Sequence, residues 1–136
     1  MILLDTNICA AAIRDDHRVA SRLIQHGGRV RIPFVVAAEL RFGLEKLARS
    51  GRASESLRAR VDRFFAMAGG ILLMTATVLE RYAVLRADLE AAGTPIGAHD
   101  LWIAAQALAE DAVLVTDNTR EFGRVPDLRL QNWLRR

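Results

Sequence analysis

The stretch Ala112-Val113-Leu114-Val115-Thr116-Asp117 is a short apolar run that ends in a threonine and an acid. A run of this length, rich in β-branched residues and without polar alternation, is typical of a strand buried on both faces of a parallel sheet. Ile2-Leu3-Leu4-Asp5, near the start of the chain, has the same form. We therefore expect two buried strands, each followed closely by an aspartate.

The sequence between and around these two runs alternates between helical and strand-like patterns. Apolar residues at three- and four-residue spacing predict helices around 19–24, 36–49, 57–65, 78–89 and 101–108, and shorter runs predict strands at 30–34, 71–74 and 128–130. Residues 117–122 are expected to form a turn or a single helical turn. This alternation implies a mostly parallel sheet flanked by helices on both faces, that is, an α/β fold of the α/β/α sandwich type.

Length and composition are those of a single globular domain. The chain has 136 residues, of which 51% are hydrophobic, so we expect one domain, 1–136, with a substantial core. No apolar run approaches the roughly 20 residues of a membrane helix, and the early acid Asp5 does not suit a signal peptide. Cys9 is the only cysteine and cannot form an internal disulfide. We expect a cytoplasmic protein that does not contact membranes.

Nearly all of the positive charge is carried by arginine. Basic residues outnumber acidic ones by 19 to 16, and Lys46 is the only lysine. Arginine suits planar, bidentate contact with phosphates. The segment from Arg41 to Arg63 holds seven basic and three acidic residues, which makes it a candidate surface for a polyanion. A solvated helix face, or the codon bias of a GC-rich genome, explains the same pattern, so charge alone does not decide the function.

Four acids fall where α/β proteins build their sites. Asp5 and Asp117 follow the two buried strands, and ligands of open parallel sheets bind beyond the carboxyl ends of the strands. Glu39 and Asp100 lie near the starts of expected helices, where an acid also complements the helix dipole. An aspartate at a strand end can equally serve as a helix N-cap. The positions of these acids alone therefore leave both a structural role and a ligand role open.

Glu39 is the acid that a structural role explains least well. It lies in the apolar run Phe34–Leu40, so we expect a half-buried carboxylate that needs a metal or an arginine such as Arg41 as its partner. Four carboxylates at one edge of a sheet would repel one another unless cations lay between them. Oxygen ligands favour hard ions such as Mg²⁺ or Mn²⁺, and one or two of these ions can support phosphodiester cleavage.

Four motifs, in order along almost the whole chain, resemble those of PIN-domain ribonucleases, and most closely those of the VapC toxins of bacterial toxin–antitoxin pairs. They are Leu3-Leu4-Asp5-Thr6-Asn7, then Pro33-Phe34-Val35-Val36-Ala37-Ala38-Glu39-Leu40-Arg41-Phe42-Gly43, then Pro95-Ile96-Gly97-Ala98-His99-Asp100-Leu101-Trp102-Ile103-Ala104-Ala105, and finally Val115-Thr116-Asp117-Asn118-Thr119-Arg120-Glu121-Phe122 with Val125-Pro126 and Asn132-Trp133.

The resemblance implies a metal-dependent endoribonuclease toxin with a PIN-like fold. Members of this family cut structured RNA, often tRNA, are held inactive by a VapB-type antitoxin, and usually form homodimers or larger toxin–antitoxin complexes. The resemblance also implies a Mg²⁺ or Mn²⁺ site made by Asp5, Glu39 and Asp100, with a fourth ligand after the penultimate strand. Many relatives place that acid where this chain has Asn118, one position after Asp117. We expect Asp117 to be the fourth ligand, with Asn118 as the alternative.

Five further polar residues are candidates for supporting the acids or contacting substrate. Thr6 and Thr116 have hydroxyls that could hold the acids or a phosphate, although each could instead cap a helix or end a strand. Asn7 and Asn118 are candidates for the layer around the ligands or are turn residues. Arg120 is a candidate contact for RNA or antitoxin, or a plain surface charge. His99 adjoins Asp100 but points elsewhere on a helix, so we expect it at the surface.

Two other functions compete with the ribonuclease hypothesis. An aspartyl-phosphate phosphatase would use Asp5 as its nucleophile, but such enzymes usually need a second aspartate at the position of Asn7 and a lysine further along than Lys46. A non-catalytic PIN-like module would bind RNA or a partner without cutting, and the ambiguity between Asp117 and Asn118 leaves this alternative open. Metal binding separates the non-catalytic module from the nuclease.

Overall fold

Strand β1 (Ile2–Leu4) lies at the centre of a five-stranded sheet in the computed structural model, which describes residues 1–135. The strand order is β3-β2-β1-β4-β5, and all four pairings are parallel. The other strands are β2 (Val30–Pro33), β3 (Ile71–Leu72), β4 (Val113–Val115) and β5 (Arg129–Gln131). The two apolar runs that end in acids are thus β1 and β4, which pair with each other.

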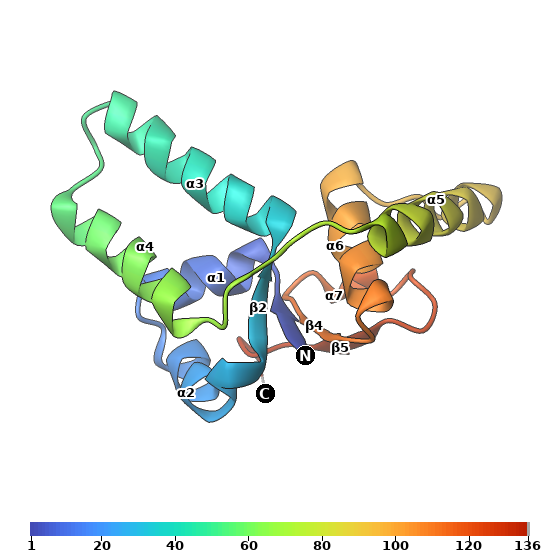
Figure 1. Cartoon of the computed structure of the whole chain (residues 1–136), viewed down its shortest axis with the longest axis horizontal. Coiled ribbons are helices and arrows are strands. Elements are labelled where there is room, and N and C mark those ends of the chain that lie inside the picture. The colour runs from blue at the N-terminus through green and yellow to red at the C-terminus, as the bar shows by residue number, and fades with distance from the viewer. Residues whose placement is uncertain (136) are drawn as a thin grey trace.

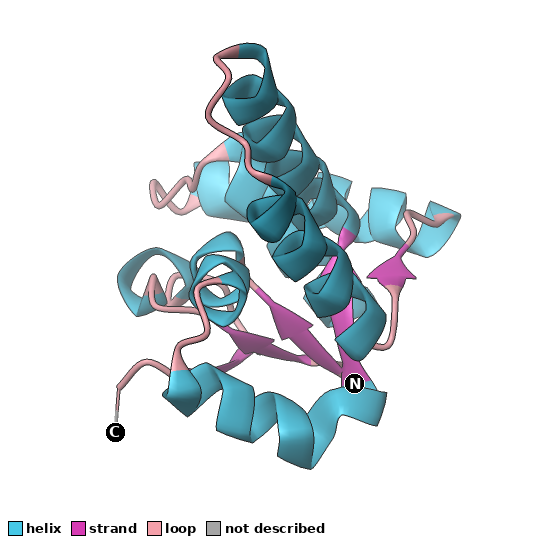
Figure 2. Cartoon of the chain, turned by 90° about the vertical axis from the view of Figure 1, so that its left-hand side faces the viewer, coloured by secondary structure: helices cyan, strands magenta, loops and turns pink. Residues whose placement is uncertain are grey.

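The helices cover the sheet on both faces, as Figure 2 shows. They are α1 (Thr6–Ile13), α2 (His17–His26), α3 (Phe34–Arg49), α4 (Glu55–Met67), α5 (Ala76–Ala91), α6 (Ala98–Ala109) and the single turn α7 (Thr119–Phe122), with a 3₁₀ turn η1 (Gly27–Arg29) before β2. In Figure 1, α1 to α4 lie on the left of the strands and α5 and α6 on the right, and α3 and α4 form a hairpin that projects beyond the sheet. The expected α/β fold with a parallel sheet is confirmed.

The core is built from the strands and the faces of the helices that meet them. Leu3, Leu4 and Leu114 are fully buried, which explains the uninterrupted apolar character of β1 and β4. Cys9 is buried among them and packs in the core. Ile24, expected in the apolar stripe of α2, is instead 79% exposed, because α2 buries only Val19 and Leu23. No helix within residues 1–135 is long and apolar enough to span a membrane.

Element boundaries differ from expectation mainly at proline and at strand ends. The strand expected at 30–34 ends at Pro33, and Phe34 already begins α3. Proline has a fixed φ and no N–H, so it suits the position just before a helix but cannot cap that helix with its side chain. Thr75 is the N-cap of α5, with its Oγ1 accepting a hydrogen bond from the Val78 N–H. The last strand is displaced by one residue, to Arg129–Gln131.

Gln106 ties α6 to two neighbouring elements in a way that the sequence did not indicate. Its side chain is fully buried. The Gln106 Oε1 atom accepts a hydrogen bond from the Phe34 N–H (3.1 Å), and its Nε2 donates to the Leu72 carbonyl (2.9 Å). The first N–H groups of a helix lack intrahelical partners, and Pro33 supplies none. Gln106 therefore acts as the missing cap of α3 and fixes where that helix starts.

Replacing Gln106 by alanine should therefore destabilise the fold by about 2–3 kcal/mol, because it leaves two polar groups unpaired and a cavity behind. The free energy of unfolding, measured by urea titration, checks this expectation. Gln25→Ala, at an exposed position of α2, is the matched control and should leave stability nearly unchanged. Equal effects of the two substitutions would contradict the capping role of Gln106.

Candidate active site

The carboxyl ends of β1 and β4 open into a polar hollow of about 600 Å³, called here the carboxylate hollow. The chain proceeds from β1 to β2 and β3 on one side of the sheet and adds β4 and β5 on the other, so this is the switch point at which open α/β sheets bind ligands. The hollow is lined by Asp5, Thr6, Asn7, Glu39, His99, Asp100, Asp117 and Asn118. The structure thus gathers all four acids predicted from the sequence around one space.

Asp5 is held more firmly than any other acid of the hollow. It is 5% exposed. One carboxylate oxygen accepts the Thr6 N–H at the start of α1, and the other accepts the Thr116 hydroxyl, both at 2.7 Å. The Asp5 N–H in turn donates to the Val115 carbonyl (2.9 Å) and continues the β1–β4 ladder. Asp5 is therefore both a helix cap and an acid fixed inside the hollow, so the two roles do not exclude each other.

Asp100 lies in the first turn of α6, half-buried on the other side of the hollow. Burial raises its pKa to about 7, and the nearby charges of Glu121 and Asp5 and a hydrogen bond to Glu121 add to the effect. Burial and like charges both favour the neutral form of a carboxyl group. Without a cation in the hollow, Asp100 therefore holds a proton near neutral pH.

Glu121, in α7, is the acid that the sequence interpretation missed. Its Oε1 accepts the Gly97 N–H (2.7 Å) and its Oε2 accepts the Asn118 amide (3.1 Å). These two donors, the Gly97 N–H first, lower the pKa of Glu121 below its ordinary value. Glu121 is thus an ionised carboxylate beside Asp100. Only Asp117 and Asn118, the two residues after Thr116, were expected as the fourth ligand, so Glu121 in the next turn was not considered.

Asn118 connects the two acids that lie closest to it. Its side-chain amide donates to Glu121 and lies 3.4 Å from Asp100 Oδ2, and its own N–H donates to the Thr116 hydroxyl (2.9 Å). Thr116, which is fully buried, therefore bridges Asp5 and Asn118. The supporting roles expected for Thr116 and Asn118 have a physical basis in these bonds.

Asp117 borders the carboxylate hollow but is bound to the C-terminal segment. Its Oδ1 accepts hydrogen bonds from Asn132 Nδ2 (2.8 Å) and Arg135 Nε (3.1 Å). These two donors, Asn132 first, lower the pKa of Asp117. The assignment of Asp117 as a fourth metal ligand stays a prediction. Its carboxylate would have to bind a cation in the hollow while it still accepts these two hydrogen bonds.

Glu39 is exposed in α3, although it borders the hollow. The expectation of a half-buried charge was wrong, because the apolar residues around it in sequence face other directions of the helix: Val36 and Ala37 are buried, whereas Glu39 is not. Arg41 is not its partner. The Arg41 guanidinium pairs with Asp62 (3.3 Å) and lies over the Phe65 ring.

Most of the remaining predicted residues line the carboxylate hollow, and one lies outside it. Asn7 is exposed and His99 half-buried, and both line the hollow; His99 is thus less exposed than expected. Arg120 is exposed and is not among the lining residues. The Thr6 side chain reaches the hollow, but its Oγ1 is buried without a hydrogen-bond partner within residues 1–135. An unpaired buried hydroxyl is costly, and the contact of Thr6 with a ligand stays a prediction.

The carboxylate hollow offers the type of ligand atom that a hard divalent cation prefers. Its acids and the Thr6 hydroxyl offer oxygen atoms, which Mg²⁺ and Mn²⁺ prefer. Burial, with the charges of Glu121 and Asp5 in addition, raises the pKa of Asp100, and a bound cation would counter this effect. Across residues 1–135, however, no three acidic, histidine or cysteine side chains are already arranged as a group that could hold a metal ion. Glu39 lines the hollow but is exposed, so the metal site stays a prediction.

Known proteins are similar to this chain in sequence and in fold. The family model described as "PIN domain" matches residues 2–128. Ribonuclease VapC2 of Rickettsia felis is 37% identical to the chain over 134 residues, with 96% of each protein covered. The tRNA(fMet)-specific endonuclease VapC of Shigella flexneri is 33% identical over 132 residues, also with 96% of each covered. The chain belongs to the VapC branch of the PIN-domain family. The family expected from the four motifs is thereby confirmed.

The solved structures support the same family. The VapBC2 complex from Rickettsia felis, bound to a DNA fragment from its promoter, contains a chain that superposes on this PIN domain with a TM-score of 0.86 at 36% identity. The match covers 98% of this chain and 99% of that chain. The expected PIN-like architecture is therefore confirmed over nearly the whole length of the chain.

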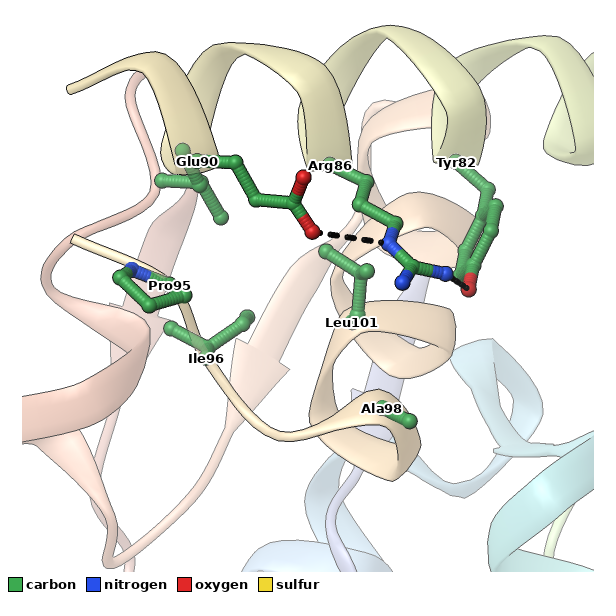
Figure 3. Close-up of a pocket in the computed structure, with 8 residues that line it drawn as sticks. Tyr82, Arg86, Glu90, Pro95, Ile96, Ala98 and Leu101 are labelled. Atoms are coloured by element: carbon green, nitrogen blue, oxygen red, sulfur yellow. Dashed lines mark hydrogen bonds and ion pairs between the residues drawn. The ribbon is translucent and has the colours of Figure 1, made fainter. Parts of the chain in front are cut away.

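A second, smaller pocket of this PIN domain, about 140 Å³, lies between α5 and the segment that leads into α6. Figure 3 shows the Arg86 guanidinium at its edge, bonded to Glu90 Oε1 and to the Tyr82 hydroxyl, both at 3.1 Å. Because its only cation is already paired and Leu89, Ile96 and Leu101 supply apolar walls, this pocket lacks the oxygen cluster that distinguishes the carboxylate hollow.

The raised pKa of Asp100 predicts a pH-dependent stability in the metal-free PIN domain. The unfolded chain releases the Asp100 proton near pH 4, whereas the folded chain keeps it to about pH 7. Between these values the folded state binds more protons, so the contribution of Asp100 to stability falls as the pH rises. Asp100→Asn should therefore stabilise the chain by about 1 kcal/mol at pH 7.5, after allowance for solvent screening.

Urea unfolding with EDTA at pH 4.5, 6 and 7.5 measures this effect. The difference between Asp100→Asn and the unaltered chain should shrink towards pH 4.5. Asp88→Asn, at an exposed position of α5, is the control. A difference that does not change with pH would contradict the ionisation behaviour described for Asp100.

Proposed function

We propose that this chain is an endoribonuclease toxin that hydrolyses a phosphodiester bond in structured RNA with the help of Mg²⁺ or Mn²⁺. The named relatives are a ribonuclease and a tRNA-specific endonuclease, and they match the chain over nearly its full length. A tRNA is accordingly the substrate that we propose first. The observation that carries the proposal is the convergence of Asp5 and Asp100 in one hollow at the switch point of the sheet.

Asp5 and Asp100 would hold one or two divalent cations. Glu39 would contact a cation either directly or through a water molecule. A divalent ion bound there lowers the pKa of a water molecule and offsets negative charge on the scissile phosphate. Thr116 and the Thr6 N–H fix the Asp5 carboxylate, so its position does not depend on the ligand. Asp100 must lose its proton before it can serve as a ligand, because only the carboxylate binds metal strongly.

The chain offers two surfaces for the protein partners that its relatives suggest. A groove between α1, α2 and α4 combines apolar Leu23, Phe64 and Met67 with Arg60 and Arg63, which suits an amphipathic, acidic segment. We propose that a VapB-type antitoxin docks there, since relatives occur as VapBC complexes.

The second surface is an apolar hollow of about 480 Å³ between α3, α5 and α6. Phe34 (46% exposed) and Leu79 (60% exposed) border it, together with Trp102. Exposed apolar patches of this kind favour association. We propose that this face forms the homodimer that the family resemblance implies.

Asp5→Asn and Asp100→Asn should each reduce RNA cleavage by more than about 100-fold, because each removes a charge from the proposed metal site. Cleavage of a tRNA transcript with Mg²⁺ or Mn²⁺, with mapping of the cut ends, measures this. Asp88→Asn removes an exposed acid far along α5 and should cleave normally. Full activity of both site variants would refute the nuclease assignment.

Calorimetry with Mn²⁺ should show binding only to chains with an intact hollow, and a failure of the unaltered chain to bind would favour a non-catalytic module.

Glu121→Gln should impair cleavage and Mn²⁺ binding more than Asp117→Asn. Glu121 contacts Asp100 and ties α7 to Gly97, whereas Asp117 is bonded to Asn132 and Arg135. We expect a loss of roughly 10- to 100-fold for Glu121→Gln. The comparison uses the same tRNA transcript and calorimetric titration for both variants. A greater loss with Asp117→Asn would identify Asp117 as the fourth acid, as the sequence predicts.

A further inference from the structure

A second charged hollow lies at the opposite edge of the sheet from the carboxylates. It has a volume of about 400 Å³ and is lined by Arg22, His26, Arg29 and Arg129, with Met1, Ile2, Val113 and Gln131 as its floor. We call it the basic hollow. Three of its residues, Ile2, Val113 and Arg129, lie side by side at the amino ends of β1, β4 and β5 in the parallel register. No aspartate or glutamate lines it.

Two of the three arginines have free guanidinium groups. Arg22 and Arg29 are exposed and form no hydrogen bond or ion pair with any side chain between Met1 and Arg135. In the rest of the described chain, arginines such as Arg18 and Arg49 pair with an acid, whereas others such as Arg14 and Arg81 do not. Arg22 and Arg29 differ from such isolated arginines because they line one hollow, where their positive charges are available to an anionic ligand.

The other two polar groups are held in position by their neighbours. Arg129 is anchored to the Asp111 carbonyl and carboxylate. The His26 ring is stacked on Trp133, with 6.0 Å between ring centroids. His26 also lies one helical turn after Arg22, so both face the same side of α2. The hollow therefore combines two fixed groups with two free arginines, as expected for a binding surface whose contacts are partly preformed.

A phosphate-rich ligand matches this arrangement better than a small carboxylate. Arginine contacts phosphate oxygens in a planar, bidentate manner, and the hollow is wide enough for more than one phosphate. Ile2, in its floor, is three residues from Asp5 along β1, or about 10 Å at the rise of a strand. A folded RNA presents phosphates of several strands over such distances and is recognised largely through them.

We infer that the basic hollow binds backbone phosphates of the RNA substrate at a point away from the bond that is cut. This inference rests on the proposed ribonuclease function. It gives the chain a second contact with RNA, which favours folded molecules that reach both edges of the sheet over short single strands. Duplex DNA carries the same phosphates and is the competing ligand in the test.

Binding to a fluorescent tRNA transcript, measured by anisotropy with EDTA present to stop cleavage, tests the inference. Arg22→Gln/Arg29→Gln should bind about 10-fold more weakly than the unaltered chain at 0.1 M salt, and the dependence of log K on log salt should become shallower by roughly 1 to 2. The matched control is Arg14→Gln/Arg81→Gln, which removes two exposed arginines outside the hollow. Thermal unfolding checks that all variants fold.

The possible outcomes distinguish a failure of the inference on the basic hollow from a failure of the proposed ribonuclease function. Unchanged RNA affinity of Arg22→Gln/Arg29→Gln, or an equal loss in the control pair, would overturn the inference even if the chain cleaves RNA. Loss of affinity for a DNA duplex with retained affinity for tRNA would also overturn it and assign the hollow to DNA. Failure of the proposed function would appear separately, as intact tRNA after incubation of the unaltered chain with Mg²⁺ or Mn²⁺.

Discussion

The hydrogen bond between the Thr116 hydroxyl and Asp5 joins the fold to the site. It connects the ends of β1 and β4, the two strands at which the sheet changes direction, at 2.7 Å and out of contact with solvent. The same aspartate caps α1 through the Thr6 N–H. A buried carboxylate is tolerated only when its oxygens are satisfied, so the strand pairing, the helix start and the position of the acid depend on one another. A change at either end of this bond therefore affects architecture and chemistry together.

Burial without a full set of hydrogen-bond donors, with nearby negative charge in addition, distinguishes Asp100 from Asp5. Asp5 has donors for both oxygens, whereas Asp100 faces Asp5 and the ionised Glu121 with only the distant Asn118 amide beside it. Burial and these like charges favour the neutral form of Asp100. Glu121 remains ionised because Gly97 and Asn118 donate to it. Asp100 is therefore partly protonated near pH 7 at the place where the proposed mechanism needs a divalent ion, so ion binding should be accompanied by proton release.

Much of the fold and part of the site followed from the order of residues. The parallel sheet was predictable because the apolar runs of β1 and β4 can be accommodated only between two layers of helices. Asp5 and Asp100 were predictable because strand ends and first helical turns lie at one edge of such a sheet. The exposure of Glu39 was not predictable, because the seven residues Phe34–Leu40 do not show by themselves which face of α3 is buried. Gln106 and Glu121 were missed because their partners are backbone groups 72 and 24 residues away in sequence.

Parallel topology also explains how one small chain can hold opposite charges at its two edges. Helix α1 follows β1 and α6 precedes β4, so both helices start at the carboxyl edge and their positive ends lie beside Asp5 and Asp100. A helix that precedes a strand ends at the opposite edge, so the negative end of α2 lies beside His26 and the chain then reaches Arg29 and β2. The helix dipoles therefore favour acids at one edge and cations at the other. Because these contributions come from the backbone, the two hollows can keep their charges apart without ion pairs across the sheet, and each remains available to an external ligand of opposite sign.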